Sequence, residues 1–180
     1  MPQLVTSNAR KLREFERFGL SLSLAFGVDL PEVDGDADEV VVRKALAAGA
    51  DRIVEDTILE INGEPIVDIR WRLDEAAQLD GAPARWVVSL GLNDGRSIRV
   101  YRGAVHGTIS GGGPAPADAF GFDPFFVPSG CDLSLYMLDR LGRKDEYSAR
   151  RLACEAMMAD RAVLVRPLHQ ITAWTGGWQS

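Results

Sequence analysis

Apolar positions along the first third of the chain switch between helical and strand periodicity. Residues 8–19 carry apolar side chains three positions apart and end at a glycine, which predicts an amphipathic helix. Residues 20–26 are apolar at every second position, which predicts a strand. Residues 36–49 begin with aspartates that can cap a helix and end at a glycine, which predicts a second helix.

Strand signals dominate the middle of the chain. Residues 53–61 are rich in β-branched side chains and end at Asn62-Gly63, which predicts a strand entering a tight turn. Residues 86–92 and 97–101 flank an Asn-Asp-Gly-Arg sequence, which predicts a hairpin, and residues 104–109 could extend the same sheet.

Two further helices are predicted, a short one at residues 74–79 and a last one at about 148–160. Strands and helices therefore mix without strict alternation, which favours an α/β fold with a mixed, partly antiparallel sheet. The pattern predicts no helix or strand for the glycine-rich tail that contains Trp174 and Trp178.

Two adjacent acids, Glu55 and Asp56, interrupt the apolar strand at residues 53–61. Neighbouring side chains of a strand point to opposite faces, so the two acids cannot both lie on one solvated side. Burying an ionised carboxylate without a partner costs several kcal/mol, so we expect these acids to have cations. The alternative is an edge strand with one acid in water and the other in a salt bridge.

Composition limits the function classes. With 46% apolar residues, 180 residues suit a single domain, although two lobes that share a cleft are possible at this length. The net charge of −6 argues against a nucleic-acid or anionic-membrane surface. No apolar run approaches the ~18 residues of a membrane span, and the N-terminus does not resemble a signal peptide. Only two cysteines and two histidines are present, which favours the cytoplasm and disfavours a histidine-rich metal site.

Several short motifs could carry chemistry. The sequence Thr6-Ser7-Asn8-Ala9-Arg10-Lys11 joins a strand to a helix N-terminus, a favourable place for phosphate, although simple helix capping also explains it. Glu32, in a polar loop, could join Glu55 and Asp56 as a hard oxygen donor for Mg²⁺, or could simply face solvent.

The second half of the chain adds an aromatic and a basic motif. In Phe120-Gly121-Phe122-Asp123-Pro124, a glycine between two aromatic residues lets a flat ligand approach, or the rings pack in the core. In Lys144 to Arg151, cations fall in a helix's first turn, where they oppose the dipole, which suggests an anionic ligand or a basic surface patch. For Lys44, a solvated helix face is the favoured interpretation, and of Arg70 and Arg72, which flank Trp71, one is expected to be a surface side chain.

Taken in order, these motifs resemble the inosine triphosphate pyrophosphatases, hydrolases of purine nucleoside triphosphates outside the standard set. The segment Thr6–Lys11 is similar to the family's Thr-Gly-Asn-x-x-Lys phosphate loop. Asp-Leu-Pro-Glu at residues 29–32, Val-Glu-Asp-Thr at residues 54–57 and Phe-Gly-Phe-Asp-Pro at residues 120–124 follow, and residues 144–150 align with Lys-x-x-x-Ser-His-Arg. Five motifs in order and at compatible spacing form a specific signal that spans nearly the whole chain.

The resemblance implies an elongated mixed α/β fold with two lobes around a nucleotide-binding cleft, a single domain over residues 1–180, and usually a homodimer. It implies Mg²⁺-dependent hydrolysis of a nucleoside triphosphate to the monophosphate and pyrophosphate. The metal would be bound by Glu32, Glu55 and Asp56, and Asp56 would also orient or deprotonate the attacking water, with Lys11 as a second catalytic residue. The substrate-binding residues that it implies are Thr6, Asn8, Lys11, Lys44, Thr57, Arg70, Phe120, Gly121, Phe122, Asp123, Lys144 and Arg150.

Three departures bear on this prediction. Ser7 replaces the loop glycine, Ala149 stands where the family has a base-recognising histidine, and Arg143 replaces an acid before Lys144. We therefore expect conserved phosphate and metal chemistry with altered or relaxed base choice. Two alternatives stay open: a nucleotide-binding module that has lost catalysis, and a pyrophosphatase for an unusual nucleotide in a biosynthetic pathway.

Overall fold

The computed structural model describes residues 2–6, 9–25, 30, 33–66, 78–111 and 115–178, and only the backbone at positions 9 and 10. Three predicted site residues, Asn8, Glu32 and Arg70, lie outside the described residues, as does most of the short helix predicted at 74–79.

The chain forms two compact units. Unit 1 comprises Met1–Asp56, Val88–Gly103 and Arg150–Ser180, and unit 2 comprises Thr57–Val87 and Ala104–Ala149. The prediction of a single domain with a cleft between two lobes stays a prediction. No helix in the described part of the chain is long and apolar enough to span a membrane.

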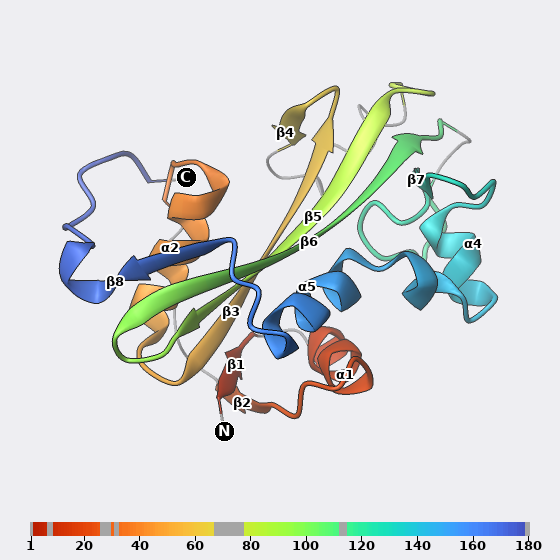
Figure 1. Ribbon diagram of the computed structural model, residues 1–180. Helices are drawn as coiled ribbons and strands as arrows, with labels where there is room; N and C mark the ends of the chain where they lie inside the picture. Colours follow the sequence, from red (N-terminus) through yellow and green to blue (C-terminus); the bar gives the residue numbers. More distant parts are fainter. Residues whose placement is uncertain are drawn as a thin grey trace. The chain divides into compact units, whose positions relative to one another are not determined.

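Eight strands in the described part of the chain belong to one mixed sheet (Figure 1). Its main order is β2-β1-β3-β5-β6-β7, with β4 paired to β3 and β8 paired to β6. β1 runs parallel to β2 and β3, whereas β4, β7 and β8 run antiparallel to their partners. The strands are β1 (Gln3–Val5), β2 (Ser23–Ala25), β3 (Arg52–Ile61), β4 (Glu64–Ile66), β5 (Pro83–Asn93), β6 (Ser97–Ile109), β7 (Phe126–Pro128) and β8 (Leu164–Pro167).

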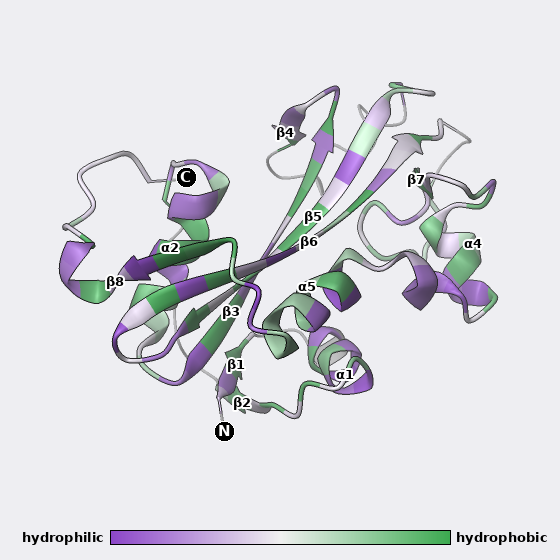
Figure 2. Ribbon diagram, in the orientation of Figure 1, coloured by the Kyte–Doolittle hydropathy of each residue, from purple (hydrophilic) through white to green (hydrophobic). Residues whose placement is uncertain are grey.

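The mixed, partly antiparallel sheet predicted from the sequence is confirmed. The predicted Asn-Gly turn follows β3, with positive φ at Asn62 (55°) and Gly63 (85°), and leads into β4. The predicted hairpin is β5–β6, and β6 continues without a break to Ile109. Hydrophilic and hydrophobic residues alternate along β6 in Figure 2, as expected for strands with two different faces. The edge-strand alternative for the two acids is wrong, because β3 lies between β1 and β5.

The helices follow their predicted boundaries where capping signals exist. α2 (Ala37–Ala48) is capped by the Asp36 carboxylate, which accepts a hydrogen bond from the Glu39 amide at 2.8 Å, and it ends at Gly49. α1 (Ala9–Arg17) and α5 (Ala149–Met158) also lie where the apolar pattern predicted helices. In the described part of the chain there are three further helical segments, which the sequence pattern did not predict: α4 (Leu135–Arg140), η1 (Lys144–Tyr147) and η2 (Leu168–Gln170).

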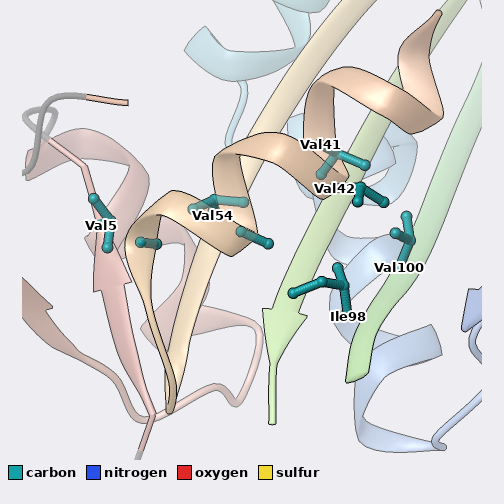
Figure 3. Close-up of a cluster of buried hydrophobic side chains, with 8 residues drawn as sticks. Val5, Val41, Val42, Val54, Ile98 and Val100 are labelled. Carbon is teal, nitrogen blue, oxygen red and sulfur yellow. The ribbon is translucent and has the colours of Figure 1, made fainter. Parts of the chain in front are cut away.

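The core of unit 1 fixes α2 against the sheet. Val41 and Val42 of α2 pack with Val54 of β3 and with apolar residues of β1 and β6 (Figure 3). Gly91 on β5 allows this close approach, because a Cβ there would lie 3.1 Å from side-chain atoms of Val41 and Val54. Since residues two apart on a strand share a face, Asp56 lies on the same side of β3 as Val54, the side that faces α2.

The core of unit 2 contains a cluster of aromatic rings. The Phe122 ring meets Trp86 edge to face at 6.0 Å and Phe126 at 6.1 Å between centroids. Gly107 of β6 is required here, since a Cβ would lie 2.3 Å from the Val127 carbonyl oxygen. This packing holds the segment that carries Phe120 to Asp123.

Candidate active site

The two acids of β3 have different partners, as strand alternation requires. Glu55 contacts cations of α1 and α5, whereas Asp56 contacts a cation of α2. The expectation that these acids have cations is therefore confirmed, and the chain itself supplies them. The prediction that Glu55 and Asp56 bind the same metal stays a prediction. β3 runs unbroken from Arg52 to Ile61 and directs the two carboxylates to opposite faces.

Glu55 is the centre of a buried ion-pair network. Its Oε2 lies 2.7 Å from Lys11 Nζ, and its Oε1 lies 2.7 Å from Arg150 Nη2 and 3.1 Å from Arg150 Nε. The Glu55 side chain is 1% exposed and that of Arg150 is 4% exposed, whereas Lys11 is 21% exposed. Of the two cations, Lys11 is therefore the one that solvent, and by extension a phosphate, can reach.

A fourth charge completes this network. The third nitrogen of the Arg150 guanidinium, Nη1, donates to Glu14, and the guanidinium carbon lies 5.8 Å from the centre of the Phe15 ring. The sequence analysis did not single out Glu14, although it lies three residues after Lys11 and thus on the same helical face. Two acids and two bases make the network neutral overall.

The charges in the network keep Glu55 ionised. Burial raises the pKa of Glu55, but the charges of Arg150 and Lys11 outweigh burial and lower the pKa to about 2. Burial lowers the pKa of Arg150, but Glu55 and Glu14 raise it above its ordinary value. Burial also raises the pKa of the neighbouring Cys154 thiol to about 12, so this cysteine is not a reactive thiolate.

Asp56 has a simpler environment. Its Oδ1 lies 3.0 Å from Lys44 Nζ, and both side chains are only slightly exposed. Lys44 comes from α2, which the unit 1 core holds in place, so the ammonium group fixes the orientation of the carboxylate. The solvated interpretation of Lys44 is wrong, since the residue is 8% exposed. Among the described residues, Asp56 Oδ2 has no protein partner.

The aromatic and basic motifs meet in unit 2. Lys144 Nζ lies 2.5 Å from Asp123 Oδ2 and 5.8 Å from the centre of the Phe120 ring. Gly121 has a positive φ of 53°, a conformation that glycine adopts without strain, and it separates Phe120 from the buried Phe122. The Tyr136 amide donates to the Asp123 carbonyl at 3.0 Å and so ties this segment to α4.

The remaining predicted positions are less informative. Thr6 follows β1 and is half-buried, and Thr57 is exposed on β3. Ala149, where the family has histidine, is completely buried, next to the buried Ser148. The chain therefore offers no imidazole at position 149 for base recognition.

The described residues fit a divalent metal only in part. No group of three histidine, cysteine, aspartate or glutamate side chains in the described part of the chain is placed to hold a metal. Asp56 offers a carboxylate oxygen, the donor that Mg²⁺ prefers. In contrast, both oxygens of Glu55 are already bound by cations.

Comparisons with known proteins found a matching family and a similar protein. Residues 3–160 match the Ham1 family. An inosine triphosphate pyrophosphatase of Batrachochytrium dendrobatidis is 30% identical over 157 residues, which cover 76% of this chain and 81% of that protein.

Two solved structures share the fold. A HAM1 protein from Coxiella burnetii superposes with a TM-score of 0.68 at 19% identity, and the Staphylococcus aureus Ham1 protein with 0.64 at 22% identity. Each match covers 89% of this chain and 98% of the other. They confirm the mixed α/β fold, and the resemblance first indicated by five short motifs is confirmed as well: the chain belongs to the Ham1 family.

Proposed function

We propose that this protein is a Mg²⁺-dependent nucleoside triphosphate pyrophosphohydrolase that releases a nucleoside monophosphate and pyrophosphate. Membership of the Ham1 family and the relative named inosine triphosphate pyrophosphatase support an enzyme that hydrolyses an acid anhydride. The observation that carries the proposal is the ion pair between Lys44 and Asp56 at 3.0 Å. The neighbouring residue on the strand, Glu55, binds Lys11, whose side chain remains accessible to solvent.

In this proposal, Asp56 acts on the attacking water. Lys44 holds the carboxylate in one orientation, and Asp56 accepts the proton as the water oxygen bonds to the α-phosphorus. The bond from that phosphorus to the bridging oxygen breaks, and pyrophosphate leaves. A bound Mg²⁺ would supply charge neutralisation for the triphosphate. Asp56 is a better candidate metal ligand than Glu55, because both oxygens of Glu55 are occupied by cations, and Glu32 would join Asp56 by resemblance.

Lys11 is the proposed phosphate ligand of unit 1. Its ammonium group is anchored by Glu55 at 2.7 Å yet remains partly exposed. Asn8 would join it by resemblance. Arg150 was also predicted to hold phosphate, but all three of its guanidinium nitrogens already bind Glu55 or Glu14. We therefore propose that Arg150 acts through Glu55, as a positioning residue.

Phe120, Asp123 and Lys144 form the proposed binding group of unit 2. An aromatic face, a carboxylate acceptor and an ammonium donor together suit a nucleobase and its attached phosphates. By resemblance the base is a purine, as in ITP, XTP or dITP. The buried Ala149 motivates our proposal that the base preference is altered or relaxed.

A substrate panel tests the proposed function. Pyrophosphate release is measured with and without Mg²⁺ on ITP, XTP, dITP, dUTP, modified pyrimidine triphosphates and the standard nucleotides. We expect Mg²⁺-dependent release from at least one of them. No turnover on any nucleotide, combined with calorimetric binding, would instead identify a binding module without catalysis, and turnover confined to one unusual nucleotide would favour a biosynthetic role.

The assembly and location are proposals of the same kind. We propose a cytoplasmic homodimer of single-domain chains, on the basis of the family resemblance. Sedimentation velocity at micromolar concentration tests the dimer, and a monomer across the concentration range would refute it.

A further inference from the structure

A row of polar side chains crosses three neighbouring strands of unit 1. It runs from Asp56 on β3 through Ser89 on β5 to Arg102 on β6. α2 supplies a partner at each end of the row, because Lys44 binds Asp56 at 3.0 Å and Asp38 binds Arg102. The proposed function uses only the Lys44 end of this row.

The strands β3 and β5 run antiparallel. The Asp51 amide, just before β3, donates to the carbonyl of Asn93 at the end of β5 at 2.8 Å. The Asn62 amide, just after β3, donates to the carbonyl of Pro83 at the start of β5 at 2.9 Å. A step forward along β3 therefore corresponds to a step backward along β5.

This register brings Ser89 next to Asp56. A Cβ on Gly91 would lie 3.1 Å from a side-chain atom of Val54, so these two positions lie opposite each other and point to the same face, which α2 covers. Asp56 is two positions forward on β3, and Ser89 is two positions back on β5. Side chains two apart on a strand share a face, so Asp56 and Ser89 are cross-strand neighbours. The Cβ atoms of such neighbours lie about 4.5–5.5 Å apart.

The Ser89 hydroxyl is buried, and its oxygen has a partner while its proton has none. The residue is 3% exposed, and its Oγ accepts a hydrogen bond from Arg102 Nε at 3.0 Å. A guanidinium has no acceptor atom, so the Ser89 proton must point away from Arg102. In the part of the chain that the structure describes, this proton has no acceptor. A buried donor of this kind is expected to bind a water or a ligand.

Asp56 offers the matching acceptor. Its Oδ1 binds Lys44, and its Oδ2 has no partner among the described residues. Asp56 and Ser89 are neighbours, yet no direct hydrogen bond joins their side chains there. A donor and an acceptor that face each other without touching suit one bridging water. Because the Asp56 side chain is 15% exposed, such a water can exchange with solvent.

We propose that Ser89 is the second protein group that holds the attacking water, which accepts a hydrogen bond from Ser89 Oγ and donates one to Asp56 Oδ2. This inference rests on the proposed function. The water keeps a lone pair for the α-phosphorus. When Asp56 takes a proton from the water, Ser89 keeps its own proton and stays neutral. Arg102 is a positioning residue, because its guanidinium, anchored by Asp38, fixes the direction of the Ser89 hydroxyl.

Two substitutions in the full chain test Ser89. Ser89→Ala removes the hydroxyl, and Ser89→Cys keeps a side chain of similar shape but donates only weakly. We expect each to lower kcat about 10-fold to 100-fold, the effect of a misplaced reactant. The KM for the nucleotide should change less than about threefold, because Ser89 contacts the water and not the nucleotide. Wild-type kcat in Ser89→Ala, or a loss confined to KM, would overturn the proposal.

Arg102→Gln has a matched control on the same strand. Arg99 and Arg102 are equally exposed, at 29% and 28%, and each pairs with one aspartate. Arg99, however, donates to Tyr101 and not to Ser89. We expect Arg102→Gln to lower kcat about tenfold and Arg99→Gln to leave it unchanged. Equal losses in the two variants, or no loss in either, would refute the positioning role of Arg102.

A double-mutant cycle with Asp56→Asn separates water binding from general stability. Once Asp56 is replaced, Ser89→Ala should cause little further loss of kcat. Multiplicative losses would show that the two residues act independently and would overturn the proposal. Each kcat is divided by the folded fraction, which urea unfolding of the variant supplies.

A high-resolution crystal structure is a readout independent of activity. The wild type should show one water within hydrogen-bond distance of both Ser89 Oγ and Asp56 Oδ2, and Ser89→Ala should lack it. A direct hydrogen bond between the two side chains, or an unchanged water in Ser89→Ala, would refute the inference. If the wild type hydrolyses no nucleotide, the proposed function fails, and the crystal structures alone then decide whether Ser89 and Asp56 share a water.

Discussion

Glu55 and Asp56 are neighbours in sequence, yet they occupy different electrostatic environments. Glu55 is 1% exposed and shared by two cations, which lower its pKa to about 2. Asp56 is 15% exposed and is held by Lys44 through one oxygen. The difference arises because β3 presents them to opposite faces, one toward α1 and α5 and the other toward α2.

The comparison teaches how one strand can supply both a structural and a chemical carboxylate. A buried carboxylate with both oxygens bound by cations cannot readily take a proton or a metal. A carboxylate held at one oxygen keeps its orientation and still offers the other. We infer that Glu55 organises the cations of the site and that Asp56 is the residue closer to the chemistry.

The largest expected effect comes from Asp56→Asn. Removal of the proposed base should reduce turnover by about 10²-fold to 10⁴-fold. The free energy of unfolding should fall by about 1–3 kcal/mol, because the buried Lys44 loses the charge of the Asp56 carboxylate. Steady-state pyrophosphate release measures the first quantity and urea unfolding the second. Glu64→Gln, an exposed acid of β4, is the control, and wild-type turnover in Asp56→Asn would contradict the assignment.

Glu55→Gln should act mainly on stability. Loss of this charge leaves Arg150 and Lys11 without their buried anion, which should cost about 3–5 kcal/mol of unfolding free energy. The matched control is Glu60→Gln on the same strand, where the partner Arg85 is 43% exposed and the expected cost is ~1 kcal/mol or less. An equal loss of unfolding free energy in Glu55→Gln and Glu60→Gln would show that the buried network stabilises the fold no more than an exposed ion pair does.

Acid should weaken the protein through the same carboxylate. The folded pKa of Glu55, about 2, lies below its ordinary value of 4.5, so its contribution is fully present above about pH 5. It is lost as pH falls from about 4.5 toward about 2, and amounts to about 3 kcal/mol in total. Urea unfolding at pH 6 and pH 3 should show the difference between wild type and Glu55→Gln shrinking. A constant difference would refute the pKa assignment.

Glu14→Gln should give the smallest effect. The Glu14 side chain is 20% exposed, and Arg150 keeps Glu55 as its main partner after the change. We expect a loss of about 1 kcal/mol in unfolding free energy, measured in urea. A loss as large as that of Glu55→Gln would mean that the two acids share the role equally.

Local signals in the sequence predicted much of the fold. The Asp36 cap, the Asn62-Gly63 turn and the β5–β6 hairpin each depend on a few neighbouring residues, and each is found where expected. In contrast, α4 has only six residues and β8 only four, too few for a periodic pattern, and both depend on tertiary contacts.

The resemblance proposed Glu55, Asp56, Lys44 and Lys144 as site residues, and their roles stay predictions. Neither the motifs nor the resemblance indicates which cation meets which acid. The Arg150–Glu14 contact joins residues 136 positions apart, and the Lys144–Asp123 pair joins residues 21 apart. Such pairs follow from how the strands and helices pack, which local pattern does not contain.

The most direct test compares the turnover of folded Glu55→Gln with that of folded Asp56→Asn. Pyrophosphate release at saturating Mg²⁺ and ITP is measured well below both unfolding transitions, and is divided by the folded fraction. We predict that Glu55→Gln turns over at least about tenfold faster than Asp56→Asn, because only Asp56 is proposed to act on the water. Equal turnover, or a slower Glu55→Gln, would contradict the division of roles between these two acids.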